Sequence, residues 1–259
     1  MNIFISFYLL SFLILPIIVL FSKSLGIFGQ FFWERATAPV AICAYQLSFN
    51  LSLTACLINT FFGLIVVWVV TRYNFPGQKL FNAIIDLPFC LPTSVAGLSI
   101  FTIYNSKSWI GRFLLKYNIH ILFTKWSLLL AMIFVSFPFA IRSIQPIFEQ
   151  IDKKLEEAAY CLGASSWQTF LKIIWPTLVP GVLTGMILSF SRCVGEYGAI
   201  VILSSNFPFK DLVAPVLIFQ CLEQYDYIGA TILGSVLIFF CFFLFFFVNI
   251  FQNFFKNYN

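Results

Sequence analysis

Long uninterrupted apolar runs constrain the fold of this sequence more than any other feature. Several of them reach roughly 20 residues, the length at which an α-helix crosses the hydrocarbon core of a bilayer. Charged residues make up 10% of the 259 residues, whereas a soluble domain carries about 25%. The mean hydropathy of +0.95 agrees with this pattern. We therefore predict an all-α integral membrane protein.

The apolar runs predict about six membrane-spanning helices. They cover residues 3–21, 48–70, 83–104, 127–144, 179–203 and 228–251. The first run lacks the basic start and small-residue cleavage site of a signal peptide, and it lacks the Arg- and Ser-rich character of a transit peptide. We therefore expect it to be a first span and not a cleaved leader. The expected organisation is an N-terminal span with its following loop at 1–47, a core at 48–252 and a short tail at 253–259.

Charge and cysteine usage exclude several classes of function. The net charge of +5 is dispersed and forms no basic stripe that could follow a nucleic acid backbone. The seven cysteines are scattered singly, and His120 is the one histidine. We therefore expect no metal site, because zinc needs clustered Cys or His ligands. Lys and Arg divide equally between the alternating loops, so their bias leaves the orientation in the membrane open.

A polar segment at about 149–176 separates the fourth and fifth expected spans. Its apolar residues recur at three- and four-residue steps as Ile151, Leu155, Ala158/Ala159 and Leu162, which predicts a helix. Gly163 fits the end of that helix. Either Ser165 or Ser166 could cap a second short helix, which would show Trp167, Phe170, Leu171 and Ile174 on one side. We expect Pro176 to stop this second helix and Pro180 to lie in the first turn of the fifth span.

Two readings of this helix pair stay open from the residues alone. An amphipathic loop can lie at the membrane interface, although interfacial helices favour Lys and Arg on their polar face. Here Glu and Asp accompany the lysines. A rigid projecting pair of helices with the small surface of Ala158 and Ala159 also suits docking into a groove of a partner protein.

Two further segments place helix-breaking or charged residues inside apolar spans. In DLPFCLPTSVAG, Pro88, Pro92 and Gly97 predict either a packed kink or a broken helix lining a pathway or gate. In SFSRCVGEYGAI, Arg192 and Glu196 are spaced to form an ion pair. Charges at this depth usually face a bundle interior or a water-filled cavity, so the pair is either structural or part of an anion pathway.

Glycines in the fifth span have a plainer interpretation. Gly181 and Gly185 are spaced as GxxxG, which lets membrane helices approach closely. We favour ordinary packing within the chain over contact with another subunit.

The polar segment resembles the EAA signature of ABC importer permeases. The matching residues are Glu157, Ala158, Ala159, Gly163, Ala164, Ile173 and Pro176, and Trp175 departs from the Leu usual in that family. The resemblance implies a type I permease fold whose loop is cytoplasmic and docks into a separate ATPase subunit, present in two copies. The chain has no GxxxxGK[ST] phosphate-binding loop. We thus expect a transport subunit that binds no cofactor and relies on ATP hydrolysed by its partner.

From about residue 48 onward the chain resembles the sulfate branch of the sulfate/molybdate group, closest to its T-type subunits. The segments DLPFCLPTSVAGLSI, SFSRCVGEYGAIVILSSNFPFK and LEQYDYIGATILG carry this resemblance. The Arg-x-x-Gly-Glu-aromatic-Gly element, which ends at Gly198, is shared with molybdate permeases, whereas LEQYDY favours sulfate. The resemblance implies a second permease subunit, either W-like or a second copy, and an anion-binding protein. Sulfate or thiosulfate is the expected substrate, with molybdate or tungstate as the alternative.

The residues give little support to two other classes of membrane protein. An ATP-independent secondary anion transporter would show an inverted repeat, and no clear one is visible. A membrane enzyme would need a cluster of His, Asp or Glu at membrane depth, and few such residues are available.

The excess of Phe, Ile and Asn is typical of an AT-rich genome, so we expect a plastid envelope membrane or a bacterial cytoplasmic membrane.

Overall fold

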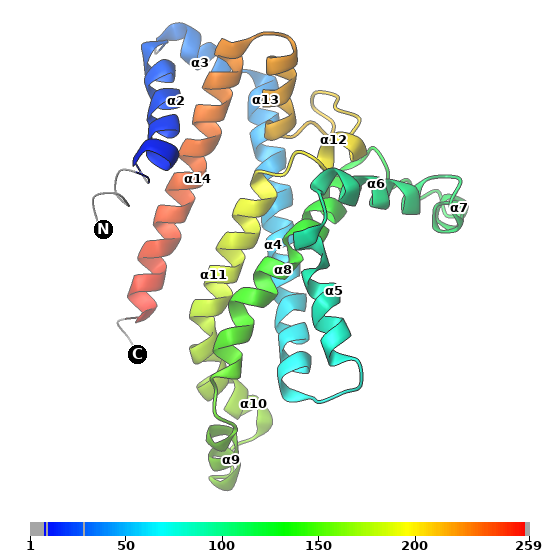
Figure 1. Ribbon diagram of the computed structural model, residues 1–259, viewed down its shortest axis with the longest axis vertical. Coiled ribbons are helices and arrows are strands. Elements are labelled where there is room, and N and C mark those ends of the chain that lie inside the picture. The colour runs from blue at the N-terminus through cyan, green and yellow to red at the C-terminus, as the bar shows by residue number, and fades with distance from the viewer. Residues whose placement is uncertain (1–7, 9, 28, 257–259) are drawn as a thin grey trace. The chain divides into compact units, whose positions relative to one another are not determined.

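The computed structural model describes residue 8, residues 10–27 and residues 29–256. Residues 3–7 and 9 of the first expected span and residues 257–259 of the expected tail lie outside this description. The described elements are η1 Leu10–Ile14, α2 Leu15–Gly26, α3 Gln30–Ala36, α4 Pro39–Arg72, α5 Gln78–Cys90, α6 Thr93–Tyr104, α7 Trp109–Lys116, α8 Lys125–Glu149, α9 Lys153–Cys161, α10 Ser166–Thr169, η2 Phe170–Ile174, α11 Trp175–Val194, α12 Ile200–Leu203, α13 Ala214–Glu223 and α14 Tyr227–Lys256 (Figure 1).

Four stretches of helix are long and apolar enough to cross a membrane: Pro39–Arg72, Lys125–Glu149, Ser166–Val194 and Tyr227–Phe246. Two bent helix pairs, α2 with α3 and α5 with α6, raise the number among the described residues to six if each pair is counted as one span. The prediction of an all-α protein with about six spans is therefore confirmed.

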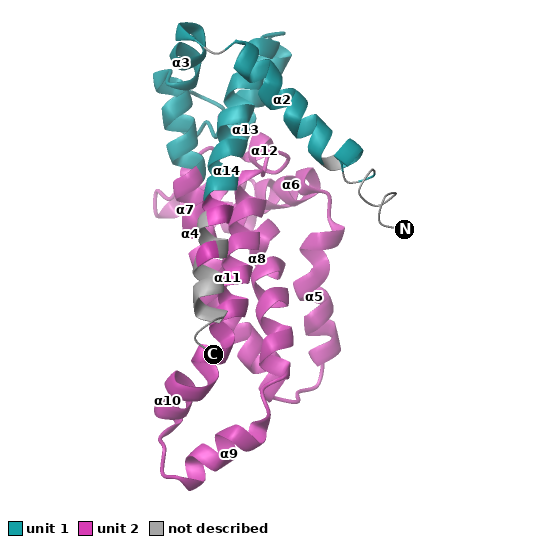
Figure 2. Cartoon of the chain, turned by 90° about the vertical axis from the view of Figure 1, so that its left-hand side faces the viewer, with its two compact units in different colours: residues 1–48, 206–243 teal, residues 49–205, 244–259 magenta. Residues whose placement is uncertain are grey.

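The chain divides into two compact units, residues 1–48 with 206–243 and residues 49–205 with 244–259 (Figure 2). In the first unit, Phe32, Ala36 and Ile232 form a buried apolar cluster. The hydroxyls of Ser24 and Ser235 lie 2.9 Å apart, so α2 and α14 also share a buried hydrogen bond.

The second unit contains the polar segment, the segment with two prolines and the Arg192–Gly198 element. Its main core is a cluster of buried aliphatic and aromatic residues contributed by α4, α5, α8, η2 and α11: Val67, Val70, Ile85, Ile141, Ile144, Phe148, Ile151, Ile174, Leu178 and Val182. The end of α4, the start of α5 and the end of α8 lie at the same end as α9 and α10, and α6, α7 and α12 lie at the other (Figure 1). This core therefore supports the polar segment directly.

Close contact between α8 and α11 follows from small residues. A Cβ added to Gly185 would lie 3.1 Å from the carbonyl oxygen and 3.2 Å from the Cα of Ala140, and one added to Gly181 would lie 3.1 Å from the carbonyl oxygen of Ser143. Both partners belong to α8 of the same chain. The interpretation of this GxxxG pair as packing within the chain is confirmed.

Several helix boundaries differ from those expected, two of them by about nine residues. The second spanning helix begins at Pro39 instead of near Ser48, because proline is well suited to the first turn of a helix. The fifth ends at Val194 instead of Leu203. Gly195 follows it as the C-cap, and the chain turns there before the separate helix α12.

Candidate functional site

Helix α9 forms the first half of the polar segment, and both of its ends are capped. The Asp152 side chain accepts a hydrogen bond of 3.0 Å from the backbone N–H of Lys154, as an N-cap does. At the other end Gly163 adopts φ +81°, and the N–H of Ala164 donates to the carbonyl of Ala159 at 3.0 Å. This is the left-handed glycine ending that the sequence predicts.

The second half begins with a capping box. Ser165 Oγ accepts from the N–H of Gln168, and Gln168 Oε1 accepts from the N–H of Ser165 at 2.9 Å. Ser165 is therefore the cap, one of the two candidates. The short helix α10 then continues without a break through η2 into α11.

The expectation that Pro176 ends the second helix is wrong. Residues Ser166–Val194 form one continuous helical stretch, and Pro180 lies inside α11. The five residues before Trp175 form a π-helix. Its wider turn changes the hydrogen-bond pattern where Pro176 lacks an N–H, so the helix passes through the proline.

Burial divides the residues of the EAA signature. Glu157, Ala158, Gly163 and Pro176 are exposed, Ala164 and Ile173 are intermediate, and Ala159 is buried. The predicted single face of α9 is only partly correct, because Ile151 and Ala159 pack inward while Leu155 and Leu162 face outward.

Exposed apolar side chains gather on the same projection. Leu162 is 88% exposed, and Tyr160 and Trp167 are also exposed. Tyr160 was not among the sequence candidates, although an aromatic residue beside the glycine turn of a polar loop was a usable signal. Helices α9 and α10 therefore offer both the Glu157 carboxylate and an apolar surface to a partner.

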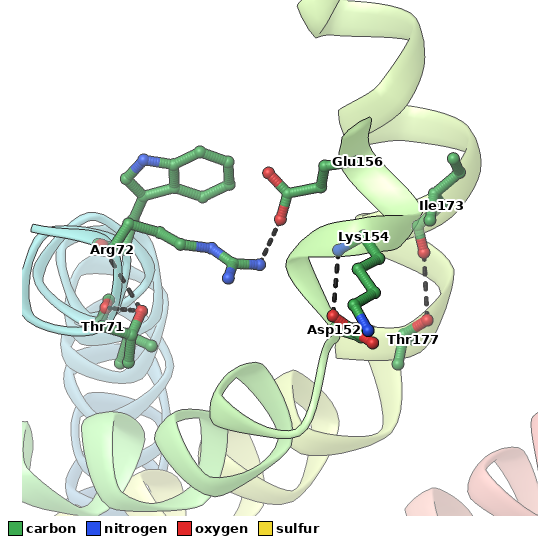
Figure 3. A network of polar contacts seen from close by, with 9 residues as sticks. Thr71, Arg72, Asp152, Lys154, Glu156, Ile173 and Thr177 are labelled. Carbon is green, nitrogen blue, oxygen red and sulfur yellow. Dashed lines mark hydrogen bonds and ion pairs between the residues drawn. The ribbon is translucent and has the colours of Figure 1, made fainter. Parts of the chain in front are cut away.

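An ion pair that sequence reasoning missed fastens α9 to α4. Arg72 Nη2 donates to Glu156 Oε1, and Figure 3 shows the guanidinium reaching from the end of α4 toward this carboxylate. The Arg72 Cζ also lies 4.7 Å from the centre of the Phe148 ring. Neither contact has a sequence signature, because the partners are 84 and 76 positions apart.

The segment with two prolines is a broken helix. Helix α5 ends at Cys90, Leu91 is extended, and α6 begins at Thr93 after Pro92, with a bend of 111° between the two helices. Pro88 remains inside α5. Of the two alternatives, the structure therefore has the broken helix and places the break at Pro92.

The broken helix packs against the segment that follows α11. A Cβ added to Gly97 would lie 2.8 Å from both the Cα and the carbonyl oxygen of Ala199, and one added to Gly198 would collide with the Thr93 hydroxyl. Gly97 of α6 thus packs against the residue that follows Gly198, and Gly198 packs against the first residue of α6. The start of α6 lies beside the end of the Arg192–Gly198 element.

The Arg192–Glu196 pair forms, with 2.7 Å between Nη1 and Oε2. It crosses the end of α11, because Val194 is the last helical residue. The side chain of Glu196 is only 1% exposed and that of Arg192 is 29% exposed. Glu196 Oε1 also accepts from the N–H of Ala199 at 2.9 Å, so the carboxylate is held from two sides and the guanidinium is the accessible member.

A third ion pair joins α5 to α8. Arg142 Nε lies 2.7 Å from Asp86 Oδ1 and its Nη2 lies 2.5 Å from Oδ2, the bidentate geometry that suits guanidinium and carboxylate. Arg142 Nη1 further donates to Gln145. An aspartate inside an apolar span was a signal for a basic partner, but it could not identify Arg142. Among the described residues, no cluster of His, Cys, Asp and Glu could hold a metal ion.

The chain matches a family model of transport components and several named permeases. The family model described as "Binding-protein-dependent transport system inner membrane component" matches residues 59–257. The chain is 53% identical over 237 residues to a probable sulfate transport system permease protein cysT of Chlorokybus atmophyticus, covering 92% of this chain and 83% of that protein. It is 51% identical over 233 residues to the sulfate transport system permease protein CysT of Synechococcus elongatus, covering 90% and 84%.

Solved structures share the fold. A chain of a bacterial ABC transporter involved in the import of the acidic polysaccharide alginate superposes with a TM-score of 0.79 at 17% identity, covering 96% of this chain and 92% of that one. A chain of an amino acid ABC transporter gives a TM-score of 0.56 at 16% identity, covering 83% and 94%.

Proposed function

Since the chain belongs to the family of binding-protein-dependent transport system inner membrane components, we propose that it is the membrane-spanning permease subunit of an ATP-driven sulfate importer. The observation that carries this proposal is about 50% identity, over some nine tenths of the chain, to proteins named as sulfate transport permeases. The relatives point to sulfate and not to molybdate. A helix pair that projects at one end of the second unit supports the ATP-driven mechanism (Figure 1).

Energy would come from a separate ATPase subunit. The chain carries no phosphate-binding loop of the GxxxxGK[ST] type, which supports an ATPase site on a separate subunit. In this proposal the exposed residues Glu157, Ala158 and Gly163 contact the ATPase, and the exposed Leu162 enters an apolar groove of it. The capped ends of α9 and the capping box of α10 keep this surface rigid, so a movement of the ATPase is passed on instead of being absorbed.

The anion pathway is proposed to pass the Arg192 guanidinium. Its partner Glu196 is buried and fully occupied, whereas Arg192 is partly accessible. A partly accessible guanidinium can attract a dianion while the neighbouring carboxylate keeps the binding weak enough for release. The break at Pro92 brings the start of α6 close to this element, and backbone N–H groups at a helix start also favour anions. Pro88, Gly97 and Gly198 would shape this junction by packing.

The partners follow from the same proposal. A type I importer pairs two permease subunits with two ATPase subunits and receives its substrate from a binding protein. One structural neighbour is a bacterial alginate transporter in complex with a substrate-bound periplasmic protein. The second permease would be a related W-like subunit or another copy of this chain. With relatives from algae and cyanobacteria, the proposed location is a plastid envelope membrane or a bacterial cytoplasmic membrane.

The test is uptake of labelled sulfate in cells that lack their own sulfate permease and receive this chain with its partner subunits. We expect uptake that requires ATP, persists in excess molybdate and is lost with Gly163→Arg. A matched control is Gly77→Arg, because Gly77 is also exposed, also has a positive φ of +92° and also has open space at the Cβ position. This control is expected to transport normally.

Two results would contradict the proposal. Uptake that continues after ATP depletion would favour a secondary transporter. Equal loss of uptake in the two glycine variants would mean that the defect is backbone strain and not the docking surface.

A further inference from the structure

Helix α9 is attached to the spanning helices through one charged contact. Glu156 of α9 accepts a hydrogen bond from Arg72, the last residue of α4 (Figure 3). Within the described residues, this is the one polar side-chain contact between α9 and a membrane-spanning helix. Glu156 directly precedes Glu157, the first residue of the EAA signature. The ion pair therefore lies on α9, the helix that carries the proposed docking surface, and joins it to α4.

Both members of the pair are largely shielded from water. The side chain of Arg72 is 12% exposed and that of Glu156 is 16% exposed. The guanidinium also lies over the buried ring of Phe148, where a cation and an aromatic face attract each other. Its Nε is buried without a hydrogen-bond partner. Arg72 therefore depends on Glu156 and Phe148 for compensation of its charge.

The surroundings of Arg72 reach both halves of the polar segment. The Trp68 ring packs edge-on against Phe148 at 5.2 Å and against Phe170 of η2 at 5.9 Å. Phe170 in turn stacks on Trp167 of α10 at 5.7 Å. The end of α4 is thus held by α9 through charge and by η2 through aromatic packing, and this packing continues from η2 to α10.

Deeper in the membrane, α4 is fixed to α8. Asn59 Nδ2 donates to the Ile133 carbonyl at 3.0 Å and to Ser136 Oγ at 2.7 Å. The bond to Ser136 is buried and the bond to Ile133 is partly buried, so both are shielded from exchange with water. A movement of Arg72 that also moves α4 is therefore passed through Asn59 to α8.

We propose that Arg72 is a positioning residue for energy coupling: its ion pair with Glu156 fastens α9 to α4, so that a movement imposed on α9 also moves α4. This inference rests on the proposed function, because it assigns a route by which the ATPase drives the permease. Arginine suits this role because its planar guanidinium can bond a carboxylate and stack on a ring at the same time. A lysine keeps the charge but interacts more weakly with the Phe148 ring.

The test uses the complete complex in liposomes and measures sulfate taken up per ATP hydrolysed. We expect Arg72→Gln and Glu156→Gln each to lower this ratio about tenfold, within the range of measured coupling free energies, while ATP hydrolysis and copurification of the ATPase subunit stay unchanged. Lys153→Gln is the matched control, because it removes a charge from the same helix at an exposed position. It should leave the ratio unchanged.

The double variant Arg72→Gln/Glu156→Gln decides whether the two residues act through each other. If they do, its ratio falls about tenfold, as in each single variant, because the second change removes nothing further. Independent roles would multiply to about a hundredfold loss and would overturn the proposal. Arg72→Lys should keep more of the ratio than Arg72→Gln.

Other outcomes are equally informative. Hydrolysis and uptake that fall together, or a lost ATPase subunit, would show that the pair serves only folding or assembly and would overturn the inference. A wild-type complex without ATP-dependent sulfate uptake would instead contradict the proposed function, so the two failures are distinguishable.

Discussion

Adding a methyl group to Gly97 or to Gly63 should change stability in opposite directions. Both glycines are buried inside spanning-helix segments of the second unit. A Cβ at Gly97 would lie 2.8 Å from two backbone atoms of Ala199, whereas a Cβ at Gly63 would lie 3.5 Å from the side chains of Ala140 and Ile141. The first is a collision with atoms that cannot rotate away, and the second is ordinary contact.

The magnitude follows from two opposing terms. Replacing glycine by alanine inside a helix stabilises it by about 1 kcal/mol. Overpacking against a close neighbour costs about 1–3 kcal/mol, and backbone contact places Gly97 toward the upper end. Gly97→Ala should therefore lower the free energy of unfolding by about 2 kcal/mol, and Gly63→Ala should raise it by about 1 kcal/mol.

The assay is unfolding of the purified chain by a denaturing detergent, followed by the fluorescence of its six tryptophans. The two variants are compared with wild type under the same conditions. If Gly97→Ala proves as stable as Gly63→Ala, the close approach of α6 to the segment before α12 is wrong. Gly97→Ala should also lower sulfate uptake, because the collision displaces the segment that follows Arg192.

Three further predictions concern the charges and caps. Arg192→Gln should destabilise the chain by about 3–5 kcal/mol because it strands a buried carboxylate, whereas Glu196→Gln should cost clearly less because the Arg192 side chain is 29% exposed. Detergent unfolding compares the two variants, and equal costs would contradict the burial difference. Gly163→Ala should cost about 1–2 kcal/mol of helix-end strain without any steric collision, measured by the same unfolding titration, and an unchanged stability would refute the left-handed turn. Ser165→Ala removes the capping box and should cost about 1 kcal/mol; hydrogen exchange should rise at the first turn of α10 and nowhere else.

The sequence predicted the spans well because membrane helices must satisfy all their backbone groups internally and expose long apolar surfaces. Proline effects were harder to predict. Pro92 breaks a helix, with Leu91 extended before it as expected for a residue preceding proline, whereas Pro88 and Pro180 remain inside helices. Neighbouring packing decides between these outcomes, and local sequence does not carry that information.

The candidate site shows the same division between local and distant information. The glycine ending at Gly163 and the cap at Ser165 were predictable because caps depend on a few consecutive residues. The Arg192–Glu196 pair was predictable from its spacing of four. The pairs Arg72–Glu156 and Asp86–Arg142 join residues 84 and 56 positions apart, and only the three-dimensional fold brings them together.

The continuous helix from Ser166 to Val194 also works as a lever. Its 29 residues, at about 1.5 Å each, give a rod about 43 Å long. No loop separates the end that carries Trp167 from the end that carries Arg192, so we treat the stretch, including the π-helix Phe170–Ile174, as one rigid rod. On that geometry a tilt of about 5° at the docking end shifts the far end by about 4 Å. Such a shift exceeds the length of the 2.7 Å contact between Arg192 and Glu196. Arg192 lies on the rod, whereas Glu196 lies beyond its end and also accepts from the N–H of Ala199, so a small rotation of the loop would strain this ion pair beside the proposed pathway.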